Sequence, residues 1–120
     1  MIFKNNGHEQ RYYEILGRMT CRDEYHTSAA YLMALVDYMQ VDDIFDFKED
    51  AINHSGLGKA WQTQSSKKAT RLMFNLWNGC ISDSPSQDEN AQFYAVDEIF
   101  SNTEYAPYFY EAVKIRFGQL

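Results

Sequence analysis

Cysteine is scarce in this chain, with only Cys21 and Cys80 among 120 residues. Two cysteines do not make the disulfide framework that stabilises small secreted domains, and in the cytoplasm they are most simply reduced thiols. The chain has no Cys-x-x-Cys or His-x-x-x-His pair, and Cys21 and His26 are five residues apart, which does not pair them on one face of a helix. We therefore predict no metal site and no cofactor.

Long apolar runs are also missing, and the first ten residues, MIFKNNGHEQ, do not have the apolar stretch of a secretory signal. We predict a cytoplasmic protein that does not contact a membrane.

Basic residues are few: eleven lysines and arginines against seventeen acids give a net charge of −6. An acidic chain disfavours non-specific binding to nucleic acid, because contacts to phosphates supply most of that affinity.

Recognisable catalytic motifs are absent as well. The sequence contains no glycine-rich phosphate-binding loop, no nucleophile elbow and no His-Glu-x-x-His motif. We therefore predict that the protein is not an enzyme and has no catalytic residues. Residue content alone leaves a cysteine nucleophile with a histidine base open. An enzyme that uses Cys80 or the Asp42/Asp43 pair is the least favoured alternative, because a sequence does not show carboxylates with separated pKa values.

What the chain does have is helical periodicity. Apolar residues recur at spacings of three and four in several segments, which predicts an all-α (mainly α) fold, a compact single-domain bundle of about four principal helices. Asp23 and Ser66 are the predicted N-caps of the second and third helices, and Gly79 ends the third. No segment alternates strictly between polar and apolar residues, so we expect no sheet. The four helices are expected near residues 7–19, 23–40, 66–78 and 106–117 of the single domain 1–120.

The third expected helix begins unusually. Lys67 and Lys68 fall in its first turn, where the backbone N–H groups already carry partial positive charge. Both lysines belong to the only basic segment: residues 51–82 contain four cations and no acid, whereas residues 37–50 contain six acids and one lysine. Two explanations account for lysines at a helix N-terminus, where they are unfavourable.

A cationic helix start can bind an anion, because Lys67, Lys68 and Arg71 would form a cluster of positive charge beside its free N–H groups. The candidate residues for this anion or partner site are Ser65, Ser66, Lys67, Lys68 and Arg71. The alternative is internal: the acids at 42–50 fold against the lysines and reach them within about 4 Å, the usual ion-pair limit. In either case we expect Lys67 and Lys68 to be exposed, with the Trp61 ring packed beneath the loop that precedes the helix.

Aromatic residues are plentiful near the C-terminus, where eight fall between positions 93 and 117. On the last expected helix, Tyr108 and Tyr110 point away from the apolar stripe, and exposed tyrosines favour protein interfaces. The alternative is partial burial in a tyrosine-rich core. The candidate protein interface consists of Tyr108, Tyr110, Asp42, Asp43 and Asp46.

One short internal similarity occurs between VDDIFD (41–46) and VDEIFS (96–101). It indicates either a duplicated unit or two capped turns that each send an Ile-Phe pair into the core. The residues after the two copies differ completely, which favours two turns.

Four segments of the chain, DDIFDFKED, GKAWQTQSSKKATRLMFNLWNG, VDEIF and YAPYFYEAVKIRF, resemble in their order a family of small bacterial and prophage or mobile-element proteins. That family is known only as a domain of unknown function. The resemblance runs from about Phe3 to Phe117 and implies a bacterial or phage cytoplasm, but no particular activity.

For function we predict a small acidic interaction module that binds and modulates a protein partner of host or phage. An acidic surface can occupy a basic groove meant for nucleic acid, so one form of this function is inhibition of a nucleic-acid-acting host system. The alternative is a nucleic-acid or anion binder that uses the basic start of the helix near 66–78.

Overall fold

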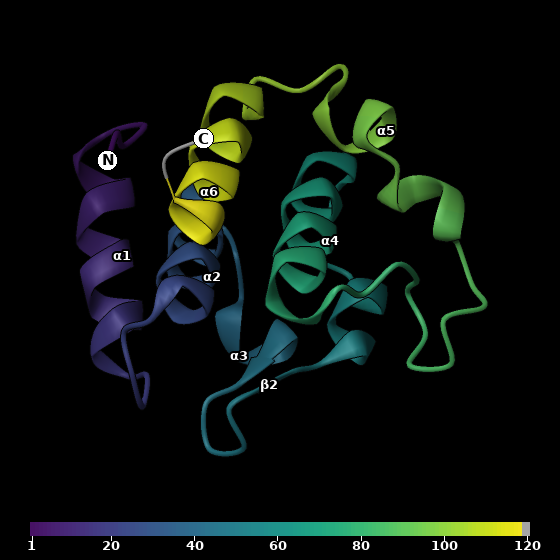
Figure 1. Cartoon of the computed structure of the whole chain (residues 1–120), viewed down its shortest axis with the longest axis horizontal. Helices are drawn as coiled ribbons and strands as arrows, with labels where there is room; N and C mark the ends of the chain where they lie inside the picture. The colour runs from purple at the N-terminus through teal and green to yellow at the C-terminus, as the bar shows by residue number, and fades with distance from the viewer. Residues whose placement is uncertain (119–120) are drawn as a thin grey trace.

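The second helix, α2 (Glu24–Leu35), lies at the centre of the fold in the computed structural model, which describes residues 1–118. Every residue from Ser28 to Val36 is buried. Three further helices, α1 (Asn6–Gly17), α4 (Gln64–Asn78) and α6 (Ala106–Phe117), pack against α2 (Figure 1). These four helices correspond to the four that were predicted, so the mainly α-helical fold is confirmed.

The N-terminal boundary of α2 agrees with the prediction, but its C-terminal boundary does not. Asp23 caps the helix as predicted, because its side chain accepts a hydrogen bond from the His26 backbone N–H at 2.9 Å. The helix ends at Leu35 and not near residue 40, because Val36 has an extended backbone with φ −94° and ψ 118°. Val36 is nevertheless buried and Met39 half-buried. Residues after the helix still face the core. The apolar spacing therefore extends past Leu35, and this is why the sequence predicted a longer helix.

The start of α4 differs from the prediction by one turn. The N-cap is Thr63 and not Ser66: Thr63 Oγ1 accepts from the Ser66 backbone N–H at 3.1 Å, and Ser66 Oγ accepts from the Thr63 N–H at 2.7 Å. This reciprocal capping box satisfies two backbone donors at once. Lys67 and Lys68 consequently lie in the second turn, beyond the free N–H groups of the helix start. Gly79, with φ +76°, ends the helix as predicted.

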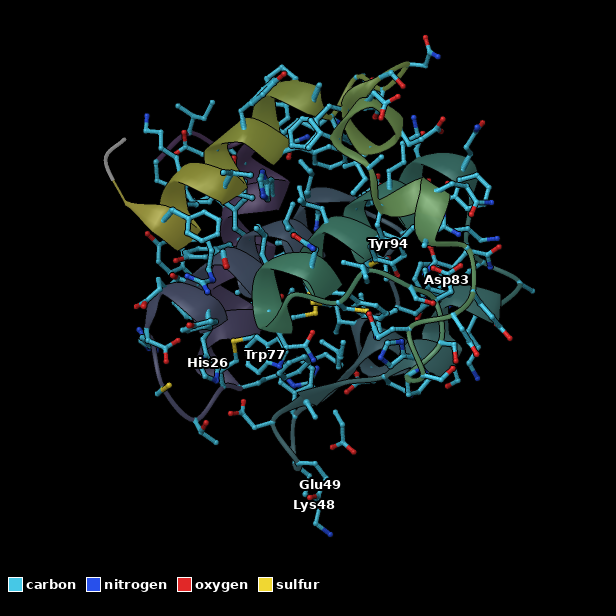
Figure 2. All side chains as sticks on the ribbon, turned by 45° about the vertical axis from the view of Figure 1, so that its right-hand side comes forward. His26, Lys48, Glu49, Trp77, Asp83 and Tyr94 are labelled. Carbon is cyan, nitrogen blue, oxygen red and sulfur yellow. The ribbon has the colours of Figure 1, made fainter. Side chains whose placement is uncertain are left out.

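A small hairpin joins α2 to α4. It comes after α3 (Val41–Ile44) and pairs β1 (Phe45–Asp46) with β2 (Ala51–Ile52) in an antiparallel ladder, with Phe45 opposite Ile52. The expectation that no sheet would form is wrong here, because two-residue strands are too short to show alternation. Asp46 Oδ1 accepts from the backbone N–H groups of Lys48 and Glu49, at 3.0 Å each, which shapes the projecting tip in Figure 2.

Several short elements complete the chain. The 3₁₀ helix η1 (His54–Gly58) comes after the hairpin, and η2 (Ala91–Tyr94) and α5 (Val96–Phe100) lie beside α4 in Figure 1. The two similar hexapeptides form α3 and α5, and their isoleucines, Ile44 and Ile99, are both buried. This agrees with two short turns, although neither turn has a side-chain cap.

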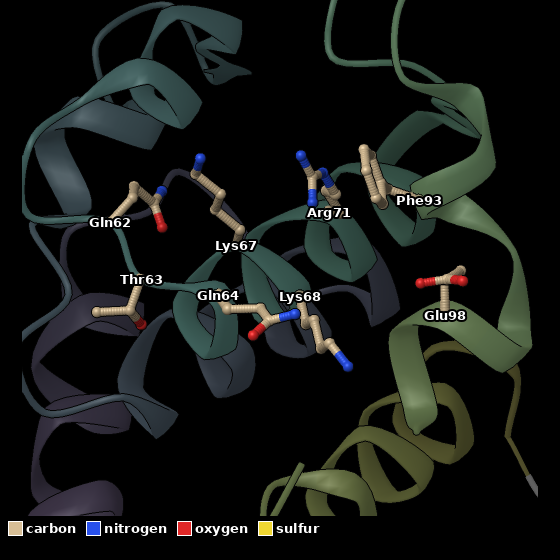
Figure 3. A pocket seen from close by; sticks show the side chains of 8 residues that line it. All are labelled: Gln62, Thr63, Gln64, Lys67, Lys68, Arg71, Phe93 and Glu98. Carbon is tan, nitrogen blue, oxygen red and sulfur yellow. The ribbon is translucent and has the colours of Figure 1, made fainter. Parts of the chain in front are cut away.

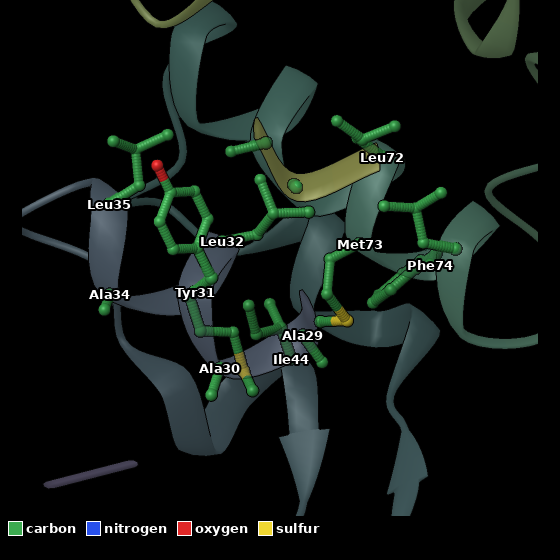
Figure 4. Packing of buried hydrophobic residues seen from close by; sticks show 14 of the residues in the cluster. Ala29, Ala30, Tyr31, Leu32, Ala34, Leu35, Ile44, Leu72, Met73 and Phe74 are labelled. Carbon is green, nitrogen blue, oxygen red and sulfur yellow. The ribbon is translucent and has the colours of Figure 1, made fainter. Parts of the chain in front are cut away.

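The core is continuous across α2, α3 and α4. Figure 4 shows Leu32 of α2 and Ile44 of α3 close to Met73 of α4, and all three side chains are almost completely buried. Buried apolar side chains of this kind contribute about 1.5–3 kcal/mol each to folding. Within residues 1–118, none of the helices is both long enough and apolar enough to cross a membrane.

Candidate functional site: a cationic cavity beside α4

A cavity of about 340 Å³ lies between the N-terminal half of α4 and the segment that contains η2 and α5 (Figure 3). Its volume is at the lower end of the range for small-ligand sites. Three residues that were predicted to bind an anion contribute to its wall, which is lined by Gln62, Thr63, Gln64, Lys67, Lys68, Arg71, Phe93 and Glu98.

The two lysines of α4 lie in the cavity wall. Both are half-buried, so the prediction that they would be exposed is wrong. No acid of residues 1–118 lies within 4.0 Å of either ammonium group. Lys68 Nζ donates to the backbone carbonyl of Ser101. In Figure 3 the Lys67 side chain projects to the same side of α4 as Arg71. Lys67 therefore places its charge in the cavity without an ion-pair partner among the described residues.

The acids that were considered as internal partners for these lysines bind elsewhere. Asp42 forms an exposed ion pair with Arg18, and Asp43 Oδ2 accepts from the Trp61 indole N–H at 2.8 Å. Asp46 shapes the hairpin turn. The internal explanation for the lysines, pairing with the acids at 42–50, is therefore wrong. Trp61 is half-buried against the core, as expected for the anchor of the loop before α4.

Arg71 differs from the lysines because its charge is balanced. Its Nε and Nη2 atoms donate to the two carboxylate oxygens of Asp83 at 3.0 and 2.8 Å. Burial acts to raise the pKa of Asp83, but the hydrogen bonds and positive charge of Arg71 outweigh it, so this pKa is below its ordinary value. The guanidinium also lies 4.7 Å from the centre of the Phe93 ring. Arg71 thus holds an aromatic wall in place and is not a free cation.

The two predicted serines, Ser65 and Ser66, do not line the cavity, and only Ser66 contacts a residue of its wall. Ser66 is fully buried, and its hydroxyl donates to Gln62 Oε1 at 2.6 Å, which orients a glutamine of the cavity wall. Sequence reasoning missed the opposite wall, Phe93 and Glu98. These residues are 22 or more positions beyond Arg71 in the chain, and no local pattern connects them to α4.

The predicted protein-interface residues have unequal exposure. Tyr110 is 62% exposed, and its ring lies 4.8 Å from that of Phe100. Tyr108 is half-buried, with its ring edge-on to His8. Tyr110 therefore remains available to a partner, whereas Tyr108 is mainly part of the packing between α6 and α1.

The groups considered for catalysis also have structural partners. Cys80 is 3% exposed, and its thiol donates to the Ser82 carbonyl at 3.0 Å. Asp42 and Asp43 are bound to Arg18 and Trp61. A thiol this deeply buried is typical of packing, not of nucleophilic catalysis.

Fold and cavity together define a small, mainly α-helical protein with a lysine-lined cavity that has one aromatic wall. The chain belongs to a family described as a family of unknown function, DUF6075, whose model matches residues 1–120. The resemblance to a domain of unknown function is thereby confirmed, while the bacterial or prophage origin stays a prediction. No curated protein and no solved structure matches the chain.

Proposed function

We propose that this protein is a non-catalytic interaction module that binds a protein partner by accepting an anionic group of that partner in the cavity beside α4. The proposal is carried by one observation: Lys67 and Lys68 lie half-buried in the same concave wall, with no ion-pair partner in residues 1–118. A half-buried cation without an ion-pair partner loses part of its hydration, and a bound anion compensates for that loss.

The cavity suits a small anionic group. Gln64 brings a hydrogen-bonding side chain and Phe93 brings an apolar wall, whereas the Gln62 amide already donates to the Gly56 carbonyl and to Thr70 Oγ1. About 340 Å³ accommodates one side chain or a terminal carboxylate, not a whole helix. Glu98 faces the lysines and opposes a strongly charged ligand. Its negative charge repels highly charged anions more strongly than weakly charged ones. The cavity therefore favours a group with one or two negative charges.

A protein partner fits the charge of the molecule better than a nucleic acid does. The net charge of −6 repels a long polyanion, whereas a single acidic group of a protein meets only the local cations. Among the predicted interface acids, Asp43 and Asp46 already accept internal hydrogen bonds. The proposed contact surface is therefore the cavity. Exposed Tyr110 remains a separate candidate contact.

Nucleic acid or nucleotide binding is the second candidate function. One observation favours it: the wall that holds Lys67 and Lys68 faces an aromatic ring, Phe93, on which a base could stack. Binding of this kind weakens steeply with salt, and the slope falls by about one for each phosphate-contacting cation that is removed.

The test compares two double variants of equal charge. Lys67→Ala/Lys68→Ala removes the cavity cations, and Lys48→Ala/Lys59→Ala removes two exposed lysines outside the cavity. Each variant and the wild type are used to capture partners from bacterial cells, uninfected and phage-infected, which includes partners in nucleic-acid-acting systems. We expect one protein to be captured by the wild type and the control but lost with the cavity variant.

Equal capture by all three proteins would contradict the proposal. A gel-shift assay at low salt distinguishes the second candidate. A shift that the cavity variant abolishes and the control retains, without any captured protein, would favour nucleic acid over a protein partner.

A further inference from the structure

Three donor atoms of different chemistry meet at the start of α2. Cys21 precedes the helix, Asp23 caps it, and His26 is its third residue. The Cys21 Sγ atom lies 3.1 Å from His26 Nδ1, and Asp23 Oδ1 lies 2.7 Å from the same nitrogen. Cys21 Sγ is also 3.4 Å from Asp23 Oδ2. The sulfur, the nitrogen and a carboxylate oxygen all lie within 4.8 Å of one another.

The other side of the His26 ring is held equally firmly. Its Nε2 atom lies 2.8 Å from Asp50 Oδ1, at the end of the hairpin turn. The ring packs edge-on to Trp77 of α4, with centroids 4.8 Å apart, and the labelled pair lies together in Figure 2. His26 is only 5% exposed, whereas Cys21 and Asp23 reach the surface. The His26 ring is thus held in place. Two accessible groups that can ligate a metal, Cys21 and Asp23, lie beside Nδ1, and the Asp50 carboxylate lies beside Nε2.

We propose that Cys21, Asp23 and His26 Nδ1 bind one divalent transition-metal ion, with zinc as the best fit, and that Asp50 accepts the N–H of Nε2. Thiolate, imidazole and carboxylate are the three protein ligands of zinc. Three of them leave a fourth tetrahedral position for water or a ligand, as in zinc sites that are not purely structural. A carboxylate on the second nitrogen of a metal-bound histidine fixes its tautomer and orientation.

The hydrogen-bond pattern of His26 is compatible with this assignment. Both ring nitrogens face carboxylate oxygens, at 2.7 and 2.8 Å, but a neutral imidazole carries only one N–H. A neutral ring with a metal ion on Nδ1 and a proton on Nε2 satisfies both sides, and in the absence of metal a protonated ring that donates from both nitrogens does the same. Zinc bond lengths place a sulfur and a nitrogen ligand roughly 3.5 Å apart in a tetrahedron. The observed 3.1 Å needs to widen by only a few tenths of an ångström.

The site does not depend on the cavity proposal, because it shares no residue with the cavity wall. Its donors come from the segment before α2 and the first turn of that helix, and Asp50 comes from the hairpin. The His26–Asp50 contact already connects the start of the central helix to the hairpin, so a metal ion on Nδ1 would be coupled to the hairpin through the same ring.

The experiment titrates the reduced, metal-free full chain with cobalt(II), and then displaces the cobalt with zinc. We expect one cobalt per chain and a charge-transfer absorption band of a thiolate–cobalt bond. Cys21→Ser should remove that band, and His26→Gln should weaken binding strongly. Asp50→Asn should weaken it by about 10–100-fold, the usual effect of losing a partner of a ligating histidine. The matched controls, Cys80→Ser and His54→Gln, should bind like the wild type.

A wild-type protein without a thiolate–cobalt band would overturn the proposal, as would a band that survives Cys21→Ser or disappears in Cys80→Ser. Circular dichroism of each variant without metal checks folding. Cys21 is exposed, so Cys21→Ser should fold even if His26→Gln does not. A second readout is the fluorescence of Trp77 in a Trp61→Phe background: zinc at His26 should change it, and no change at saturating zinc would also count against the site.

Discussion

Arg71 binds both carboxylate oxygens of Asp83, and the pair joins α4 to the polar segment after it. Their side chains are only 11% and 12% exposed. Asp83 is the first acid after the basic segment 51–82, so the cation that the charge pattern grouped with two lysines has its own partner nearby. This pair distinguishes the three cations: Arg71 has an acidic partner, whereas Lys67 and Lys68 have no ion-pair partner within residues 1–118.

The first prediction concerns the pH dependence of this pair. Asp83→Asn should lower the free energy of unfolding at neutral pH by about 1.5–3 kcal/mol, because it weakens hydrogen bonds to a charged group. The folded pKa of Asp83 is lower than its ordinary value of 3.8, so its stabilising effect is present above pH 3.8 and is lost as the pH falls through the folded pKa. Urea unfolding of both proteins at several pH values measures the difference, which should shrink in acid.

Asp97→Asn, at an exposed position on α5, is the control and should show little effect. A difference that stays constant down to acid pH would contradict the role of Asp83.

The second prediction uses Glu98, the carboxylate in the cavity wall. Glu98→Gln should strengthen anion binding a few-fold, because it removes a negative charge that faces the same space as Lys67 and Lys68. The Tm is measured against inorganic phosphate, with chloride at matched ionic strength as the reference. The phosphate-dependent rise in Tm should be largest for Glu98→Gln and smallest for Lys67→Ala/Lys68→Ala. Glu104→Gln removes an exposed acid outside the cavity and should behave like the wild type. An identical response of all four proteins would argue that the cavity does not bind anions.

The third prediction compares two neighbouring glycines of η1. A Cβ atom at Gly56 would lie 2.3 Å from the Asp43 carbonyl oxygen and 2.6 Å from Ile44 Cγ2. Since a backbone atom cannot move away cheaply, Gly56→Ala should destabilise the protein by about 3 kcal/mol or more. At Gly58 nothing lies within 4 Å, so Gly58→Ala should be close to neutral. Thermal unfolding measures both. Equal Tm values for the two variants would mean that η1 does not pack against α3 as described.

The fourth prediction tests the start of α4. Thr63→Ala should cost about 1 kcal/mol, because it leaves the Ser66 backbone N–H without its capping partner. Ser65→Ala, at the second residue of the helix and outside the capping box, should change stability by less than half of that. Urea unfolding measures both changes. A larger effect at Ser65 than at Thr63 would place the cap elsewhere.

Much of the fold can be traced to local patterns. Apolar spacing identified the four principal helices, and Asp23 and Gly79 marked two of their ends correctly, because capping and helical periodicity act within a few residues. The pattern could not separate Thr63 from Ser66 as the cap of α4, because both are small hydroxyl residues in one polar run. Ser66 is fully buried, so packing decided between them.

In both candidate sites, some residues could be identified from the sequence and others only from the tertiary structure. Lys67 and Lys68 could be singled out from the sequence because they are adjacent on a recognisable helix within an acid-free segment. Phe93, Glu98 and Asp83 could not, because only the packing of the chain after α4 brings them to that helix. Cys21 and His26 were dismissed on their spacing, which is wrong for one helical face. Cys21 lies before the helix, and the capping turn at Asp23 folds it back toward the ring, while Asp50 arrives from a hairpin 24 residues away. Local periodicity thus identified the four principal helices, and the charge pattern grouped Lys67 with Lys68. Tertiary structure alone decided which side chains face each other, because those contacts depend on chain segments that have no local signal in common.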